Sequence, residues 1–211
     1  GVRRSPIHEH LKAEGAVFGE VAGWERANWF ADPGQEREYR YSWGRQNWFE
    51  NQRREHMAVR EAVGLFDMTS FGKIRVEGRA ACAFLNRLCA NQMDVGVGRV
   101  VYTQMLNPRG GIESDLTVTR SSETAYLLVV PGATLQRDLA WLRRHQGEDA
   151  VAIIDMTAAE AVFCVMGPKS RDLIAAISPD DLSHKGFAFG TAREIEIGLG
   201  IARAHRISYV G

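Results

Sequence analysis

The stretch that most constrains the fold is residues 100–120, VVYTQMLNPRGGIESDLTVTR, which predicts two strands joined by a tight turn. Val100–Leu106 is rich in β-branched and aromatic residues, the usual makeup of a half-buried strand. Residues 107–111 supply a proline with a fixed φ and two glycines that tolerate positive φ. The returning segment, Ser114–Thr119, alternates apolar and polar side chains. We therefore expect an antiparallel hairpin here.

The hairpin carries a carboxylate just past its turn. Strand alternation puts Leu116 and Val118 on one face, and Asp115, Thr117 and Thr119 on the other. Asp115 is thus expected to project from a sheet. A carboxylate on a rigid element, near a turn that lets a ligand approach the backbone, can stabilise a cationic atom of the ligand or exchange a proton with it. From the residues alone, an Asp after a Gly-Gly turn more often serves the turn itself, and the functional reading stays open beside it.

The rest of the chain reads as strands interleaved with a few helices, many of the strands in hairpins. This pattern predicts an α+β fold with mixed, largely antiparallel sheets and packed helices. Helices are expected over 52–63, 79–90, 133–145 and 168–177, and further strands over 65–68, 71–77, 125–130, 151–156, 161–166, 193–197 and 201–210. The sequence has no GxGxxG after a strand and no GxxxxGK[ST], which argues against dinucleotide and P-loop sites.

The first 51 residues differ from the remainder. They hold four of the five tryptophans, Trp24, Trp29, Trp43 and Trp48, without clear periodicity. We expect a short helix within 11–21 and otherwise an extended strap, followed by a single domain over 52–211. The aromatic side chains either complete the core or dock the strap onto a neighbouring domain or subunit.

Composition excludes several classes of function. The formal net charge is zero, so we expect no nucleic-acid or membrane-surface partner. An odd number of cysteines without a CxxC argues against a disulfide framework and favours a reducing compartment, the cytoplasm or the mitochondrial matrix. His8-Glu9-His10 offers two imidazoles near a terminus, too few for a metal site, and we expect no metal. Arg53 and Arg54 suit a solvated helix face or a site for carboxylates.

Three separated motifs, FDMTSFGK, YTQMLNPRGGIESDLTVTR and RISYVG, resemble the folate-binding aminomethyltransferase family. That family contains the T-protein of the glycine cleavage system. The chain looks most like the C-terminal domain of dimethylglycine and sarcosine dehydrogenases, over about residues 24–211. The resemblance implies the N-terminal part of the aminomethyltransferase folate-binding fold. The family continues RISYVG with a glutamate that faces the pterin, whereas this chain stops at Gly211, so we expect a domain truncated at its C-terminus.

The resemblance also implies a site. Asp115 matches a catalytic aspartate beside the reactive nitrogens of tetrahydrofolate. Cofactor contacts are implied for five matching positions, Tyr102, Phe71, Leu128, Val130 and Tyr209. An anion at Asp115 would orient the pterin and stabilise a cationic amine in the transition state. For Phe71, Leu128 and Val130 a plain core role remains equally open, and a pterin with flat apolar walls permits both.

The implied function is a one-carbon transferase module. It would capture the unit released from an N-methyl amine, such as dimethylglycine or sarcosine, and yield methylene-tetrahydrofolate. The oxidation would belong to a flavin domain or subunit, with FAD held outside this chain. The T-protein variant takes an aminomethyl-lipoyl donor instead, and a demethylase would use another methyl donor. The alternative from a different class is a non-catalytic module that keeps the fold for domain or subunit contact.

Overall fold

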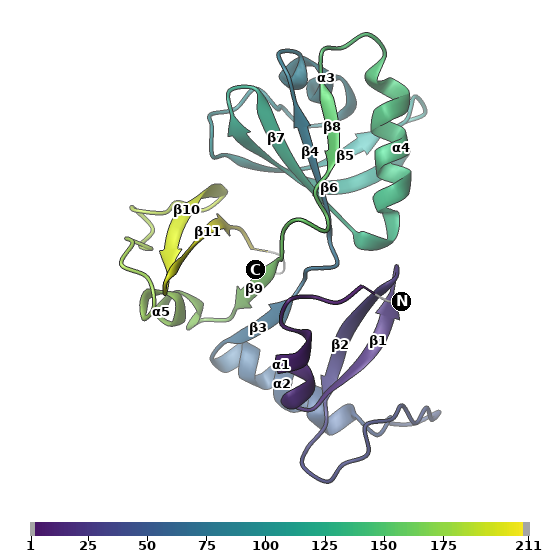
Figure 1. Ribbon diagram of the computed structural model, residues 1–211, viewed down its shortest axis with the longest axis vertical. Helices are drawn as coiled ribbons and strands as arrows, with labels where there is room; N and C mark the ends of the chain where they lie inside the picture. Colours follow the sequence, from purple (N-terminus) through teal and green to yellow (C-terminus); the bar gives the residue numbers. More distant parts are fainter. Residues whose placement is uncertain (1–2, 209–211) are drawn as a thin grey trace. The chain divides into compact units, whose positions relative to one another are not determined.

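The computed structural model describes residues 3–208 (Figure 1). The chain divides into two compact units. The first comprises Gly1–Ser70 and Ala161–Leu173, and the second comprises Phe71–Glu160 and Ile174–Gly211. Each unit therefore joins two separate parts of the sequence, and the boundary predicted after residue 51 falls inside the first unit.

The first unit begins with a helix and a hairpin. Helix α1 (His8–Ala13) leads into β1 (Ala16–Val21), which pairs antiparallel with β2 (Trp24–Phe30). Ala22 and Gly23 connect the two strands with φ of 51° and 79°. Positive φ at both central residues characterises a type I′ turn, whose twist matches that of paired strands.

The extended strap predicted for residues 1–51 is therefore corrected. The helix expected over 11–21 ends at Ala13, because Gly15 turns the chain with φ of 94° and residues 16–21 pair with β2. A Cβ at Gly15 would stand 2.6 Å from the carbonyl oxygen of Ala31, so the close approach requires glycine. Trp29 is buried and serves the core, whereas Trp43 is fully exposed. Trp29 thus completes the core, whereas docking of the exposed Trp43 onto a neighbouring domain or subunit stays a prediction.

The first unit is completed by helix α2 (Phe49–Glu61) and a small sheet. Strand β3 (Gly64–Asp67) pairs antiparallel with β9 (Phe163–Met166). The predicted helix over 52–63 and strand over 65–68 are confirmed with shifted ends. The helix ends at its C-cap Ala62, and Gly64 opens β3.

The second unit contains a five-stranded sheet in the order β5-β6-β7-β4-β8, with every neighbouring pair antiparallel. Its strands are β4 (Gly72–Glu77), β5 (Val100–Leu106), β6 (Ile112–Ser122), β7 (Ala125–Val130) and β8 (Ala152–Asp155). Helix α3 (Ala81–Leu88), the short η1 (Gly132–Thr134) and α4 (Leu135–Gln146) accompany it, with α4 beside β8 in Figure 1. The predicted α+β class with largely antiparallel sheets is confirmed.

The core of this unit lies between the helices and one face of the sheet. Phe84 of α3 and Leu142 of α4 are fully buried in the same cluster as Ile74, Val118 and Leu128 of the strands. On α3 the buried residues recur at helical spacing, at positions 81, 84, 85 and 88, as the sequence pattern predicted. Burial of this apolar face is what holds the helices against the sheet.

A separate hairpin follows in the second unit. Strand β10 (Thr191–Ile197) pairs antiparallel with β11 (Gly200–Arg206). The preceding helix α5 (Ser170–Ala175), whose first four residues belong to the first unit, is shorter than the predicted 168–177. Gly198, with φ of 56°, begins the turn expected there. Leu182, Phe187 and Ile195 form a small apolar cluster beneath this hairpin.

Candidate functional site

The turn between β5 and β6 is fixed by the side chain of Asn107. Its Oδ1 accepts hydrogen bonds from the backbone N–H groups of Arg109 and Gly111, each at 3.0 Å. The backbone N–H of Asn107 also donates to the carbonyl of Gly111 at 2.9 Å, and Gly110 has φ of 78°. A Cβ on Gly111 would lie 2.8 Å from the Asn107 amide nitrogen. Sequence reasoning anticipated the glycines here but missed Asn107.

A β-bulge after this turn determines the face on which Asp115 lies. Leu106 pairs with Ile112, but Met105 pairs with Ser114, so Glu113 is the extra residue. Without this bulge, continued pairing from Leu106 would set Gln104 opposite Ser114. With it, Gln104 lies opposite Asp115, and Ser114 is directed into the core, where it is buried. Bulges commonly re-aim a side chain next to a functional site.

Asp115 is an exposed carboxylate held by its cross-strand neighbour. The Gln104 amide donates a hydrogen bond from Nε2 to Asp115 Oδ1 over 3.1 Å. Tyr102, 61% exposed, lies on the same side and pairs with Thr117. We call this side, with Tyr102, Gln104, Asp115 and Thr117, the Asp115 face of the sheet. It presents an anion, an amide and an aromatic ring from two adjacent strands.

The register extends the Asp115 face across the sheet. Thr117 pairs with Val129, and Val129 pairs with Lys73 of β4. Lys73 is only 1% exposed, although its side chain carries an amine. Phe71, a predicted cofactor contact, precedes Lys73 by two residues just outside β4 and is half-buried. Strand alternation therefore gives Phe71 the same side as Asp115.

Two other predicted contacts lie on the opposite side. Leu128 pairs with Ile74 and Val118, and both Leu128 and Val130 are buried in the core beneath the helices. The same register directs Val129 to the Asp115 face. The assignment of Leu128 and Val130 to a cofactor pocket stays a prediction, and Tyr209 lies outside the described residues.

Helix α4 supports the bulge from the core side. Arg137 donates from Nη2 to the carbonyl of Glu113 at 2.5 Å, and Asn107 donates from Nδ2 to the Glu113 carboxylate at 2.8 Å. Next to Arg137, the buried Asp138 accepts a hydrogen bond from Thr134 Oγ1 at 2.7 Å. Burial raises the pKa of the Asp138 carboxyl, against the opposing effects of Thr134 and Arg137. These contacts hold the chain immediately before Asp115.

The remaining charged candidates lie against carboxylates within the first unit. Arg53 pairs with Glu50 at 2.7 Å, and Arg54 pairs with Asp32 at 2.7 Å. His8 Nε2 lies 2.6 Å from a carboxylate oxygen of Glu25. Across residues 3–208, His, Cys, Asp and Glu side chains form no group of three or more that could hold a metal ion. In the same range, no helix has the length and apolar character that crossing a bilayer requires.

Comparison with known proteins identifies relatives over the whole chain. The chain is 45% identical to a 4-methylaminobutanoate oxidase (formaldehyde-forming) from Paenarthrobacter nicotinovorans over 210 residues, which are 100% of this chain and 26% of that protein. It is 35% identical to mitochondrial dimethylglycine dehydrogenase from Mus musculus, covering 99% of this chain and 24% of that enzyme. The chain thus spans about a quarter of the length of these two relatives.

The fold is also similar to a solved structure. The aminomethyltransferase T of the glycine cleavage system from Bartonella henselae superposes with a TM-score of 0.73 at 24% identity. The match covers 91% of this chain and 47% of that one, and at this identity it supports the fold alone. The family model described as the GCVT N-terminal domain matches residues 7–211. The chain therefore belongs to the GCVT N-terminal domain family.

Proposed function

We propose that this chain is the tetrahydrofolate-binding, one-carbon-transferring module of a longer enzyme that oxidises an N-methyl amine. The observation that carries the proposal is Asp115, an exposed carboxylate on a strand, in a chain of the GCVT N-terminal domain family. The one-carbon donor would be an N-methyl amine of the dimethylglycine or sarcosine kind, and the product methylene-tetrahydrofolate. The oxidase and dehydrogenase names of two relatives support this donor class.

The chemical types of the side chains on the Asp115 face are those that a pterin requires. A flat, partly apolar heterocycle needs a ring or aliphatic surface together with a few directed polar groups. Tyr102 supplies an exposed ring, and Gln104 and Asp115 supply an amide and a carboxylate on neighbouring strands. Bound tetrahydrofolate would contribute nucleophilic nitrogens that take up a one-carbon unit at the oxidation level of formaldehyde.

The chemical role of Asp115 follows from its charge and its support. A fixed anion stabilises positive charge that develops at an adjacent nitrogen, and it costs little reorganisation when it is already oriented. Gln104 orients one carboxylate oxygen by donating to it, while the bulge at Glu113 fixes the backbone. Tyr102 would position the ring system rather than take part in the transfer.

A titration of reduced tetrahydrofolate into the purified chain tests the proposal. Asp115→Asn keeps the size of the side chain and removes the charge, and Asp172→Asn, on exposed helix α5, is the matched control. We expect Asp115→Asn to weaken binding about tenfold or more, by the magnitude of a charge-assisted hydrogen bond, and Asp172→Asn to bind as the parent chain does. Equal binding by all three chains would refute a folate site at Asp115.

The oxidation step requires a flavin, which we assign to a separate domain or subunit. This chain accounts for only 26% and 24% of two relatives that are named as an oxidase and a dehydrogenase. The assignment is tested by joining the chain to the remaining three quarters of such an enzyme. Bound flavin should copurify with that part whether or not this chain is attached; flavin that copurifies with this chain alone would contradict it.

An exposed aromatic loop favours a second candidate function, contact with another domain or subunit without catalysis. Trp43 and Tyr41 are both exposed in the segment between β2 and α2. In the same segment, the rings of Tyr39, Tyr41 and Trp48 contact one another, with centroids 5.2 to 6.0 Å apart. Exposed Trp and Tyr residues are typical of energetically important interface positions. A folded chain that binds no tetrahydrofolate, yet loses a partner on Trp43→Ala, would favour this function.

A further inference from the structure

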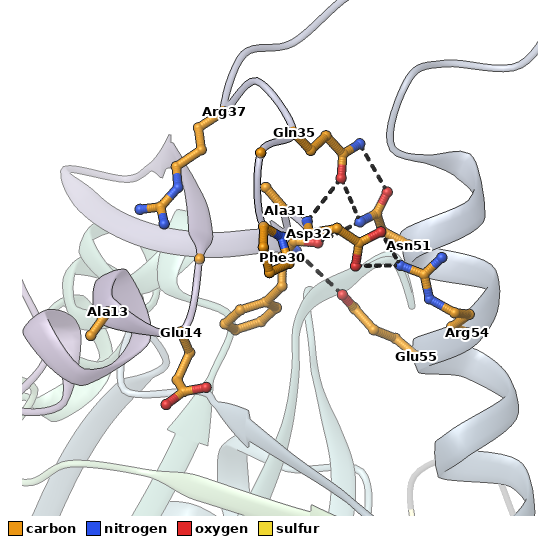
Figure 2. A pocket seen from close by; sticks show the side chains of 13 residues that line it. Ala13, Glu14, Phe30, Ala31, Asp32, Gln35, Arg37, Asn51, Arg54 and Glu55 are labelled. Carbon is orange, nitrogen blue, oxygen red and sulfur yellow. Dashed lines mark hydrogen bonds and ion pairs between the residues drawn. The ribbon is translucent and has the colours of Figure 1, made fainter.

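The first unit contains a cavity of about 580 Å³ that the proposed function does not use. It is formed by the end of α1, by the end of β2 with the turn that follows, and by α2 (Figure 2). Its volume lies within the range of small-molecule sites, roughly 300–1,000 Å³. All of its lining residues belong to the first unit, so the cavity is independent of Asp115 and of the folate proposal.

A network of amides makes the wall of this cavity rigid. Asn51 is buried, and its Nδ2 donates to the carbonyl of Phe30 at 2.7 Å and to Gln35 Oε1 at 2.9 Å. Gln35 Oε1 also accepts from the backbone N–H of Asp32 at 2.9 Å. The turn after β2 is thereby tied to α2, as Figure 2 shows. These amides are occupied with one another, so they shape the cavity and leave ligand contacts to other groups.

The charges that line the cavity are not balanced. Asp32 accepts two hydrogen bonds from Arg54, at 2.8 and 2.7 Å, and these two residues neutralise each other. Glu14 and Glu55 form no ion pair within residues 3–208. Arg37 donates to the carbonyl of Lys12 at 3.1 Å and is the remaining cation of the lining. Two carboxylates against one guanidinium leave the cavity with an excess of negative charge.

The favourable contacts of the Glu55 carboxylate do not offset the free-energy cost of its partial burial. Its Oε1 accepts a hydrogen bond from the backbone N–H of Phe30 at 3.3 Å, but burial still raises the pKa of its carboxyl. A cation next to Glu55 would offset this cost of burying a charge. In the view of Figure 2, the ring of Phe30 lies between the side chains of Glu14 and Glu55. The half-buried ring adds a face that attracts cations.

From this arrangement we propose that the cavity binds a small organic ammonium ion, with Glu55 and Glu14 as its anionic partners and the Phe30 ring as its apolar and cation–π surface. A bare metal ion would lack a ligand set, because the described residues contain no group of three or more metal-binding side chains. An anion is disfavoured because carboxylates outnumber the unpaired guanidinium. Ala13 and Pro33 on the wall suit the alkyl substituents of an organic cation.

The probe that tests this proposal is trimethylammonium, with tert-butanol as an uncharged molecule that also carries three methyl groups on its central atom. NMR titration of the chain reports both affinity and place through the shifts of Phe30 and of the backbone amides of α2. We expect trimethylammonium to bind with a Kd in roughly the millimolar range, and tert-butanol to bind at least about tenfold more weakly. Equal affinities would show a merely apolar hollow and overturn the proposal, as would the absence of binding.

Matched variants distinguish the effect of losing the carboxylate charge from the effect of disturbing the fold. Glu55→Gln keeps an oxygen for the Phe30 N–H and removes the charge, so we expect about tenfold weaker binding. Glu50→Gln, on the same helix but paired with Arg53 outside the cavity, should leave affinity unchanged. If Glu55→Gln perturbs the amide spectrum of the first unit, Glu14→Gln decides, since the exposed Glu14 side chain forms no ion pair within residues 3–208. Binding that is unaffected by loss of the carboxylate charge overturns the proposal.

Discussion

Replacing Leu128 by alanine tests the face assignment on which the candidate site depends. Leu128 is 0% exposed and lies in the cluster between the sheet and the helices, so truncation should leave a cavity there. Buried Leu→Ala substitutions cost about 2–5 kcal/mol of unfolding free energy. The neighbouring Val129 is half-buried on the Asp115 face, and Val129→Ala should cost about 1 kcal/mol or less.

Amide hydrogen exchange is the appropriate assay for this pair. Four of the five tryptophans lie in residues 1–51, so fluorescence would report mainly on the first unit. Exchange of the slowest amides in β4, β6 and β7 gives the opening free energy of the sheet itself. If Val129→Ala lowers that free energy as much as Leu128→Ala does, the register and the two faces derived from it are wrong.

The same two variants also bear on the proposed binding of tetrahydrofolate. If Leu128 supports the fold and does not touch the ligand, Leu128→Ala should change the affinity for tetrahydrofolate little under conditions in which the chain stays folded. Val129→Ala removes methyl groups from the Asp115 face and should weaken binding directly. The reverse order of effects would support the original assignment of Leu128 as a pocket residue.

Three further outcomes are expected. Gly110→Ala should destabilise the second unit by about 1–2 kcal/mol, because Gly110 has φ of 78° and alanine is strained there. Gly96→Ala is the control, since the space around its added Cβ is open. Equal opening free energies of the two variants in amide exchange would contradict the expected strain at Gly110. The folded-state pKa of Asp138 is raised above its ordinary value of 3.8, so its contribution to stability is greatest at low pH and is lost as pH rises from 3.8 through the folded pKa. Asp138→Asn should remove that loss, which denaturation across this pH window will measure. Burial raises the pKa of the Cys89 thiol to about 12, so iodoacetamide at about pH 8 should label Cys89 only after unfolding, as mass spectrometry will show.

Much of the second unit could be predicted because its signals are local. The alternation in residues 114–119 and the Asn-Pro-Arg-Gly-Gly turn specify the β5–β6 hairpin, and both strands lie where they were expected. Helix α3 follows from apolar residues at helical spacing. In contrast, the apolar run of β7 does not reveal which side chains face the helices, because every position from 125 to 130 is hydrophobic.

The first unit was harder to predict because its determinants are not local or carry weak signals. The β1–β2 turn has Ala22 at positive φ, a position at which Asn or Gly is the usual sequence signal. The sheet of β3 and β9 pairs residues 64–67 with 163–166, and the sequence of neither segment indicates which strand it will pair with. The cavity beside α2 depends on Gln35 and Asn51, two polar residues of a kind that usually marks a surface loop.

The position of Asp115 shows why matching a motif identifies a residue but does not explain its placement. The hairpin alone would set Gln104 opposite Ser114, and the extra residue Glu113 changes that pairing to Asp115. This bulge is held by Asn107 from the turn and by Arg137 from α4, which lies 24 residues further along the chain. The sequence of the hairpin contains the first contact but not the second. The side of the sheet on which the Asp115 carboxylate projects is thus a property of the packed unit, since the helix that buries the core face also fixes the backbone that directs Asp115 away from it.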